Sequence, residues 1–196
     1  MGRRRYALSF FIVAFVALTL ALSLQFVVVR GISMEPTCHD GDFLICSRGG
    51  EIRRGDVVVL QDKSSTGLLC KRVIALSGDE ITIHGNRVNV NDYMVQEPYL
   101  YTQEWTSGFN GVVPDNSVYV LGDNRTDSRD SRDFGYVSMD AVRGILVFNV
   151  TKSLGVSYEM IRSSILGLLL FLVVLDIVNA FWLKFHKKQK QASEVI

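Results

Sequence analysis

The sequence contains few of the residues that usually build metal or cofactor sites. Its 196 residues include only three histidines, His39, His84 and His186, and three cysteines, and none of them has the spacing of metal ligands. His39 lies near Ser33, but nothing else suggests a Ser-His triad. The carboxylates are scattered among turns, which gives no clear pair for acid–base catalysis. We therefore expect neither a metal nor another cofactor.

A large excess of either charge is also lacking, because the formal net charge is +1. Residues 30–162 carry 14 of the 21 basic and 18 of the 20 acidic residues, for a net charge of −4. Nucleic-acid-binding domains usually present a clustered basic surface. From this charge distribution we expect no nucleic-acid partner.

The three cysteines, Cys38, Cys46 and Cys70, cannot all pair within one chain. A Cys38–Cys46 disulfide across a turn at Gly41-Asp42 is conceivable. The favoured interpretation is that all three are small buried apolar residues.

Two long apolar segments lie near the ends of the chain. Residues 6–29 contain no charge, and residues 163–183 are long enough to cross a bilayer as a helix. Because basic residues beside a span stay in the cytoplasm, Arg3–Arg5 and the lysines after residue 183 predict that both termini are cytoplasmic. The predicted parts are a cytoplasmic N-terminus (1–5), an anchor (6–29), an extracytoplasmic domain (30–162), a second span (163–183) and a basic cytoplasmic tail (184–196). The protein is thus expected to be a multi-pass protein of the cell membrane.

Each span has an alternative interpretation. The first could be a cleaved signal peptide, but its apolar region is too long and no small-residue cleavage motif follows. The second contains Asp176 and Asn179 on one helical face, and a carboxylate at the bilayer centre costs about 2.5–3.5 kcal/mol. This pair could contact the first span or a partner protein, or it could be displaced toward the inner interface. The sequence leaves these options equal.

Residues 30–162 show the alternation of β-strands rather than the period of helices. Short apolar runs, such as "DFLIC", "DVVVL", "KRVIAL", "SVYVL" and "GILVF", follow or precede turn residues. The stretch "EITIHGNRVNVND" alternates on both sides of Gly85-Asn86, which predicts a two-residue hairpin. Residues 96–111 have no period and are expected to be an excursion. The predicted fold class is mainly β, an antiparallel sheet or barrel-like domain tethered by two transmembrane helices.

Lys71 is the one outer lysine within an apolar run. In a strand it shares one face with Val73 and Ala75, and burial of that face would favour the neutral, basic amine. From this stretch alone, a lysine on an amphipathic strand is the more frequent explanation.

Four stretches of the sequence, taken together, favour a functional role for Lys71. "SMEPT", "GDVVVL", "KRVIALSGD" and "GDNRTDSRDSRDFGYV" follow one another as they do in bacterial type I signal peptidases, which this chain strongly resembles. The last stretch fits the family pattern GDNRxxSxDSRxFG at every fixed position, from Gly122 to Gly135. The resemblance covers the first anchor and nearly all of the outer domain, but not obviously the second span.

The resemblance implies a Ser-Lys dyad that cleaves signal peptides from exported preproteins. Ser33 would be the nucleophile and Lys71 the general base, with the Ser33 N–H binding the oxyanion; relatives often add a hydroxyl where this chain has Gly31. Ser128 would orient the lysine amine. The remaining implied roles are a supporting ion pair, Asp130 with Arg132, and a small apolar pocket for an Ala-x-Ala site, formed by Met34, Leu69 and Cys70.

Ser33 would lie four residues beyond the anchor, at the depth where a cleavage site leaves the lipid bilayer. Phe43, Leu44 and the aromatic residues of 96–111 could contact lipid too, although each is individually more typical of a core. The alternative function is a dedicated or catalytically silent signal-peptidase-like factor for the assembly of particular surface proteins. Such relatives usually lose the serine or the lysine, whereas this chain keeps both.

Overall fold

The computed structural model describes residues 22–61, 67–102 and 104–168, together with residues 15, 19 and 171. The chain divides into two units, Met1–Gly155 and Val156–Ile196. In the second unit, residues 158–168 are helical. Among the described residues, no helix has both the length and the apolar character needed to cross a membrane.

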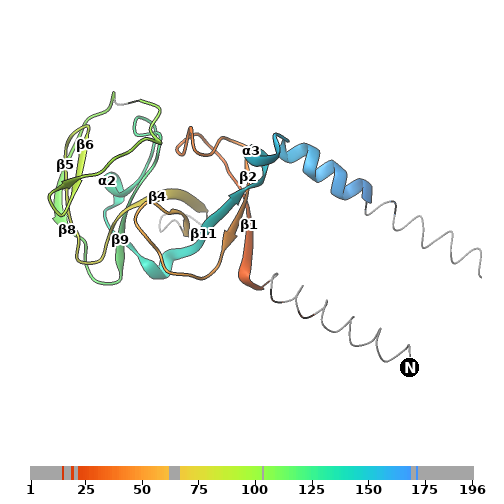
Figure 1. Cartoon of the computed structure of the whole chain (residues 1–196), viewed down its shortest axis with the longest axis horizontal. Coiled ribbons are helices and arrows are strands. Elements are labelled where there is room, and N and C mark those ends of the chain that lie inside the picture. Colours follow the sequence, from red (N-terminus) through yellow and green to blue (C-terminus); the bar gives the residue numbers. More distant parts are fainter. Residues whose placement is uncertain are drawn as a thin grey trace, which may run out of the picture. The chain divides into compact units, whose positions relative to one another are not determined.

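The first unit is built on a seven-stranded antiparallel sheet, in the order β1-β2-β11-β3-β4-β9-β10 (Figure 1). Strands distant in sequence are neighbours, because β11 is inserted between β2 and β3. The strands are β1 (Leu24–Val28), β2 (Phe43–Ser47), β3 (Val57–Gln61), β4 (Leu68–Leu76), β9 (Ser117–Leu121), β10 (Val137–Ser138) and β11 (Val142–Asn149).

A second, four-stranded antiparallel sheet has the order β7-β6-β5-β8. Its strands are β5 (Glu80–Gly85), β6 (Arg87–Val90), β7 (Tyr93–Met94) and β8 (Ser107–Val112). His84 pairs with Arg87, so Gly85-Asn86 forms the two-residue hairpin that the sequence predicts. The antiparallel, mainly β fold and all the strands expected from apolar runs are confirmed.

Three short helical segments complete the unit: α2 (Ser131–Phe134), the 3₁₀ turn η1 (Met139–Ala141) and α3 (Val150–Leu154). Their first turns are capped by the side chains of Asp130, Ser138 and Asn149. No amphipathic pattern in the sequence predicts these segments, because helices this short carry no helical period.

Two expectations for particular segments are wrong. Residues 107–112, expected within an irregular excursion, form β8 and pair with β5 along its whole length. Residues 24–28, expected at the end of the anchor 6–29, form β1 and pair with β2. An apolar run rich in β-branched residues can form either a strand or the end of a membrane helix. Here the hydrogen bonds to β2 stabilise the strand. The rest of residues 6–29 lies largely outside the described part, as do Asp176, Asn179 and most of residues 163–183.

Buried apolar side chains form three clusters in the first unit. One lies against the smaller sheet around Tyr119 and Trp105, and a second lies around Val58, Val73 and Val120. The third packs Met34 and Leu44 with Cys38 and Cys46, so Leu44 is a core residue and not a lipid contact. All three cysteines are free; Cys38 and Cys46 are fully buried, and Cys70 is half-buried. The favoured interpretation of the cysteines is thus confirmed for the first two.

Candidate active site

Ser33 lies on a turn that connects β1 to β2. The Glu35 N–H donates to the Ile32 carbonyl, and the Cys38 N–H donates to the Met34 carbonyl. The Met34 side chain, only 1% exposed, fixes the turn to the core beneath it. Ser33 is therefore held on a compact turn directly after β1. In the following paragraphs we call residues 33–37 the nucleophile turn.

Lys71 approaches Ser33 from the middle of β4. Its Nζ lies 2.7 Å from Ser33 Oγ and 2.9 Å from the Cys70 carbonyl oxygen. The side chain shares its strand face with Val73 and is buried, at 2% exposure for the residue. The strand face that carries Lys71 is thus buried, as the interpretation of Lys71 as a base requires.

This environment favours the neutral form of the Lys71 amine. Burial lowers the pKa of Lys71 from its ordinary value of 10.5, and the nearby Arg129 charge acts in the same direction. The carboxylates of Asp130 and Asp123 act in the opposite direction but do not reverse the shift. A neutral amine beside a hydroxyl can accept its proton, so the pair has the contact that nucleophilic catalysis requires.

A glycine at the end of β9 allows a second segment to approach this pair. A Cβ built on Gly122 would collide with Ser128 Oγ, and would lie 2.5 Å from Ser128 Cβ and 2.6 Å from the Ser33 carbonyl oxygen. The Asn124 N–H also donates to the Ser33 carbonyl at 3.1 Å. The backbone of Ser33 thus packs directly against residues 122–128.

Ser128 does not make the contact expected of it. Its Oγ is buried and has no hydrogen-bond partner in the described structure. The predicted role of this hydroxyl, orienting the Lys71 amine, therefore stays a prediction. The chain does bring the hydroxyl close to the backbone of Ser33, because both lie against Gly122.

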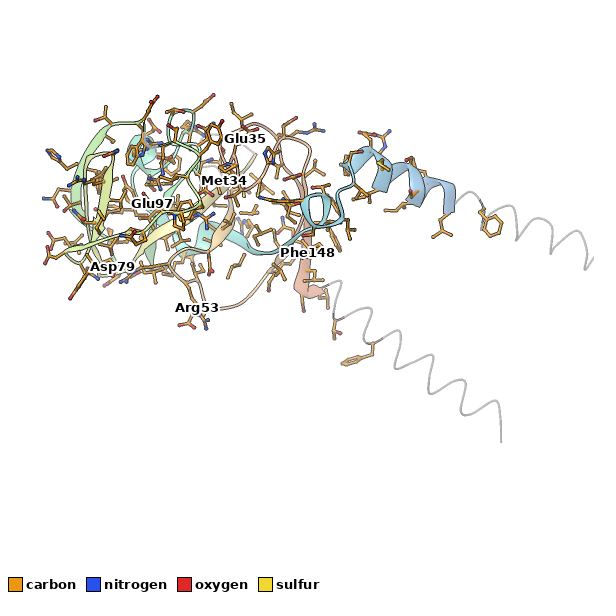
Figure 2. All side chains as sticks on the ribbon, turned by 45° about the horizontal axis from the view of Figure 1, so that its top comes forward. Met34, Glu35, Arg53, Asp79, Glu97 and Phe148 are labelled. Atoms are coloured by element: carbon orange, nitrogen blue, oxygen red, sulfur yellow. The ribbon has the colours of Figure 1, made fainter. Side chains whose placement is uncertain are left out.

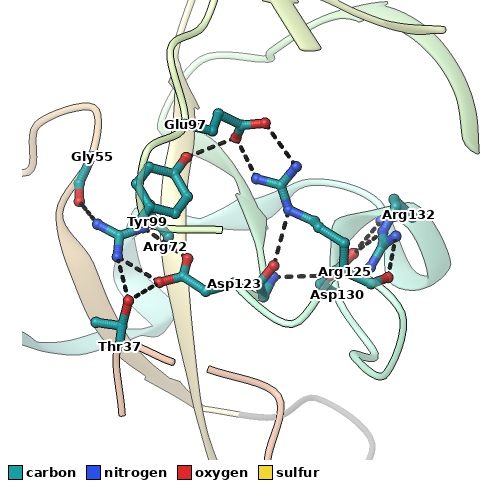
Figure 3. A network of polar contacts seen from close by, with 10 residues as sticks. Thr37, Gly55, Arg72, Glu97, Tyr99, Asp123, Arg125, Asp130 and Arg132 are labelled. Atoms are coloured by element: carbon teal, nitrogen blue, oxygen red, sulfur yellow. Dashed lines mark hydrogen bonds and ion pairs between the residues drawn. The ribbon is translucent and has the colours of Figure 1, made fainter. Parts of the chain in front are cut away.

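The expected ion pair between Asp130 and Arg132 is present behind the site (Figure 3). Arg132 Nε and Nη2 each lie 2.8 Å from an oxygen of Asp130. Asp130 also accepts a hydrogen bond from the Gly122 N–H at 2.9 Å and caps α2. This buried carboxylate thereby joins the segment containing Ser128 to the strand end that supports Ser33.

Two further ion pairs were not found by sequence reasoning. Arg72 binds both oxygens of Asp123, whose side chain is fully buried, and Arg125 binds both oxygens of Glu97 (Figure 3). Thr37 of the nucleophile turn donates to Asp123 as well. The motif "GDNR" indicates that Asp123 and Arg125 belong to the site. Their partners, Arg72 and Glu97, lie far away in the sequence, and no local pattern identifies these partners.

The three residues predicted to form an apolar pocket line one cavity of about 500 Å³ with Ser33 and Lys71. Met34 comes from the nucleophile turn, while Leu69 and Cys70 come from β4. Phe26–Val28 of β1, the following Val29 and Val59 of β3 contribute to its largely aliphatic wall. We call this space the first cavity. In the part of the chain that the structure describes, no group of histidine, cysteine and acidic residues could hold a metal ion.

The fold and this geometry define a class of protein: a β-domain with a serine hydroxyl beside a buried lysine amine, at the edge of an apolar cavity. The model of the family "Signal peptidase, peptidase S26" matches residues 3–151. The chain therefore belongs to this family of serine endopeptidases, and the resemblance seen in the sequence is confirmed.

Two signal peptidases of Bacillus species agree with the family assignment. Signal peptidase I U of Bacillus subtilis is 37% identical over 130 residues, which cover 59% of this chain and 70% of that protein. Signal peptidase I of Bacillus caldolyticus is 36% identical over 140 residues, or 62% and 76% of the two chains. A crystal structure of a signal peptidase I from Enterococcus faecalis is 26% identical, with a TM-score of 0.47, over 50% of this chain and 98% of that one.

Proposed function

We propose that this protein is a membrane-bound serine endopeptidase that removes N-terminal signal peptides from exported preproteins at the outer face of the cytoplasmic membrane. The observation that carries the proposal is the 2.7 Å distance between Ser33 Oγ and the buried Nζ of Lys71. Family membership implies preprotein substrates. The aliphatic first cavity beside Ser33 is suited to the small side chains of an Ala-x-Ala site.

In the proposed reaction, Ser33 Oγ attacks the carbonyl carbon of the scissile peptide bond while Lys71 accepts the hydroxyl proton. The tetrahedral oxyanion is stabilised by the Ser33 N–H, which makes no hydrogen bond within the described residues. Lys71 then returns the proton to the leaving amine, which gives an acyl-enzyme. The Lys71 amine then removes a proton from the water that attacks the ester carbonyl, and passes it to Ser33 Oγ as the ester bond breaks and the carboxylate product leaves.

The surrounding polar groups have positioning roles in this proposal. Asp130 and Arg132 hold the segment that carries Ser128, and Ser128 orients the Lys71 amine when substrate is bound. Because Gly31 has no side-chain hydroxyl, the main-chain N–H of Ser33 is the one oxyanion donor that we assign. Loss of a single such donor generally costs about 2.7–4 kcal/mol in transition-state stabilisation, so this N–H is central to the rate.

We also propose that the protein is multi-pass, with both termini in the cytoplasm. Because residues 24–28 form β1, the first anchor in this proposal comprises residues 6–23. Eighteen helical residues span about 27 Å at ~1.5 Å per residue, close to the hydrocarbon thickness of about 30 Å. Ser33 is then at the membrane surface, where a preprotein's cleavage site emerges.

The test is cleavage of a preprotein with an Ala-x-Ala site in liposomes. Ser33→Ala and Lys71→Met are each expected to lower kcat by at least ~10³-fold, because members of such a unit act together. Ser107→Ala, on β8 of the other sheet, is the matched control and should retain wild-type activity. Folded wild-type protein that cleaves no preprotein would contradict the proposal and favour the assembly-factor alternative.

A further inference from the structure

The nucleophile turn separates two cavities. Ser33 and Met34, at its beginning, line the first cavity; Glu35 and Pro36, its next residues, line another of about 560 Å³. We call the latter the second cavity. Figure 2 marks Met34 and Glu35, the neighbouring residues at which the lining changes from one cavity to the other.

The wall of the second cavity is hydrogen-bonded to the backbone of the nucleophile. Asn124, a lining residue, donates its main-chain N–H to the Ser33 carbonyl at 3.1 Å and its Nδ2 to the Ile32 carbonyl at 3.3 Å. Glu35 is only two residues from Ser33, so their Cα atoms are at most about 7.6 Å apart. The second cavity therefore begins within two to three extended residues of the reacting bond.

The two cavities differ in chemistry. The first is lined mainly by aliphatic side chains and contains the basic groups of Arg30 and Lys71. The second contains three carboxylates, of which Asp123 is already neutralised by Arg72. Those of Glu35 and Glu104 have no hydrogen-bond or ion-pair partner among the described residues. Their charge is thus available to a ligand.

An endopeptidase must hold its substrate on both sides of the scissile bond. If the first cavity takes the residues that precede the bond, the chain that follows it leaves past Ser33. An extended peptide advances about 3.3–3.6 Å per residue, so its second and third residues after the bond reach the level of Glu35. We propose that the second cavity binds the leaving side of the substrate and favours lysine or arginine at these two positions. This inference rests on the function proposed above.

The experiment compares three preproteins that differ only at the second and third residues after an Ala-x-Ala site: Lys-Lys, Gln-Gln and Glu-Glu. Exposed charge pairs have small effects individually, so the wild-type kcat/KM for Lys-Lys is expected to exceed that for Glu-Glu by about tenfold at low salt. Screening should reduce this ratio toward one at about 1 M salt. In Glu35→Gln/Glu104→Gln the ratio should fall to within twofold of one.

Glu80→Gln is the matched control, because Glu80 is an exposed carboxylate on β5 that lines neither cavity. It should retain the wild-type ratio. Because each ratio is measured within one variant, it is insensitive to differences in the amount of folded protein. If the double variant is inactive, Glu35→Gln and Glu104→Gln are measured separately, and each should lower the ratio to about threefold.

Two results would overturn the inference while leaving the proposed function intact. The first is equal cleavage of all three preproteins by the wild type, and the second is an unchanged ratio in the glutamine variants. Failure of the wild type to cleave any of the three is a different result, which removes the proposed function and the inference together.

Discussion

The close approach of Gly122 to Ser33 allows a sharp test of how precisely the nucleophile is held. An alanine here would place its Cβ 2.6 Å from the Ser33 carbonyl oxygen and 2.5 Å from Ser128 Cβ, whereas ordinary contacts begin near 3.4 Å. The neighbours must therefore retreat by about 0.8 Å or more, by the steric limits of a packed interior. Both neighbours belong to the proposed site, and Asn124 and Asp130 restrain the backbone that would have to move.

The magnitude follows from the sensitivity of catalysis to geometry. A misplacement of about 1 Å can lower the rate by about 10²-fold, which corresponds to about 2.7 kcal/mol at 1.36 kcal/mol per tenfold. Overpacking should also lower the free energy of unfolding by about 1–3 kcal/mol. We therefore expect Gly122→Ala to lower kcat by about 10²-fold at a temperature at which the variant is still folded.

The assay is single-turnover cleavage of a preprotein, with the folded fraction measured by circular dichroism in the same sample. Gly108→Ala is the control, because a Cβ there meets no atom within 4 Å. It should leave both kcat and stability close to the wild type. A Gly122→Ala variant with wild-type kcat would refute the reasoning, since Ser33 would then tolerate displacement of its support.

Three further predictions concern the protonation of Lys71, a buried hydrogen bond of Asp42 and the anchoring of the nucleophile turn. Protonation of Lys71 removes the base, so kcat/KM should fall as the pH drops through its pKa, which burial places below 10.5; a pH–rate profile that is flat below pH 10.5 would contradict this. Thr151→Val removes the buried hydroxyl that donates to Asp42, and should lower the free energy of unfolding in urea by about 1–3 kcal/mol at pH 7, with no loss taken as the contrary result. Lys152→Met removes the hydrogen bonds to the Pro36 and Thr37 carbonyls, at 3.1 and 3.2 Å. It should lower kcat by about threefold to tenfold, with partial recovery in Lys152→Arg; each lost bond contributes about 0.5–1.5 kcal/mol.

The Asp42 contact has a pH dependence of definite sign. Burial alone would raise the pKa of Asp42, but hydrogen bonds from Thr151, the His39 N–H and Asn149 outweigh it and lower the pKa below 3.8. Because the folded pKa is lower than the unfolded one, this stabilisation is fully present above about pH 3.8 and is lost as the pH falls through the folded value. Asp42→Asn should lose this contribution to acid sensitivity, which urea unfolding at several pH values measures.

Much of the fold could be predicted because local patterns and tertiary structure agree. Apolar runs next to turn residues, and the alternation around Gly85-Asn86, located strands β2 to β6, β9 and β11. The position of Lys71 within an apolar run suggested its burial. β8 was missed because Gly108 and Gly111 interrupt its pattern, although its backbone pairs fully with β5. β1 was missed because a uniformly apolar run does not distinguish a strand from the end of a membrane helix.

The pairings that hold the site could not be predicted from local sequence. Arg72 and Asp123 lie 51 residues apart, and their contact depends on how β4 and β9 pair. The second cavity depends on the same long-range arrangement, since Glu35 and Glu104 come to line one cavity only after folding. Such contacts follow from topology and carry no periodic signal.

The supports of the nucleophile turn have a consequence for the biosynthesis of the protein. Asn124 is 92 residues beyond the Ile32 carbonyl that it binds, and Lys152 is 116 residues beyond the Pro36 carbonyl. A nascent chain in which Ser33 and Lys71 have already been synthesised still lacks both of these contacts. The site is completed only when the last helix of the domain, α3, has been synthesised and folded. A growing chain therefore cannot hold Ser33 in the position that it has in the folded domain until these late segments have been added.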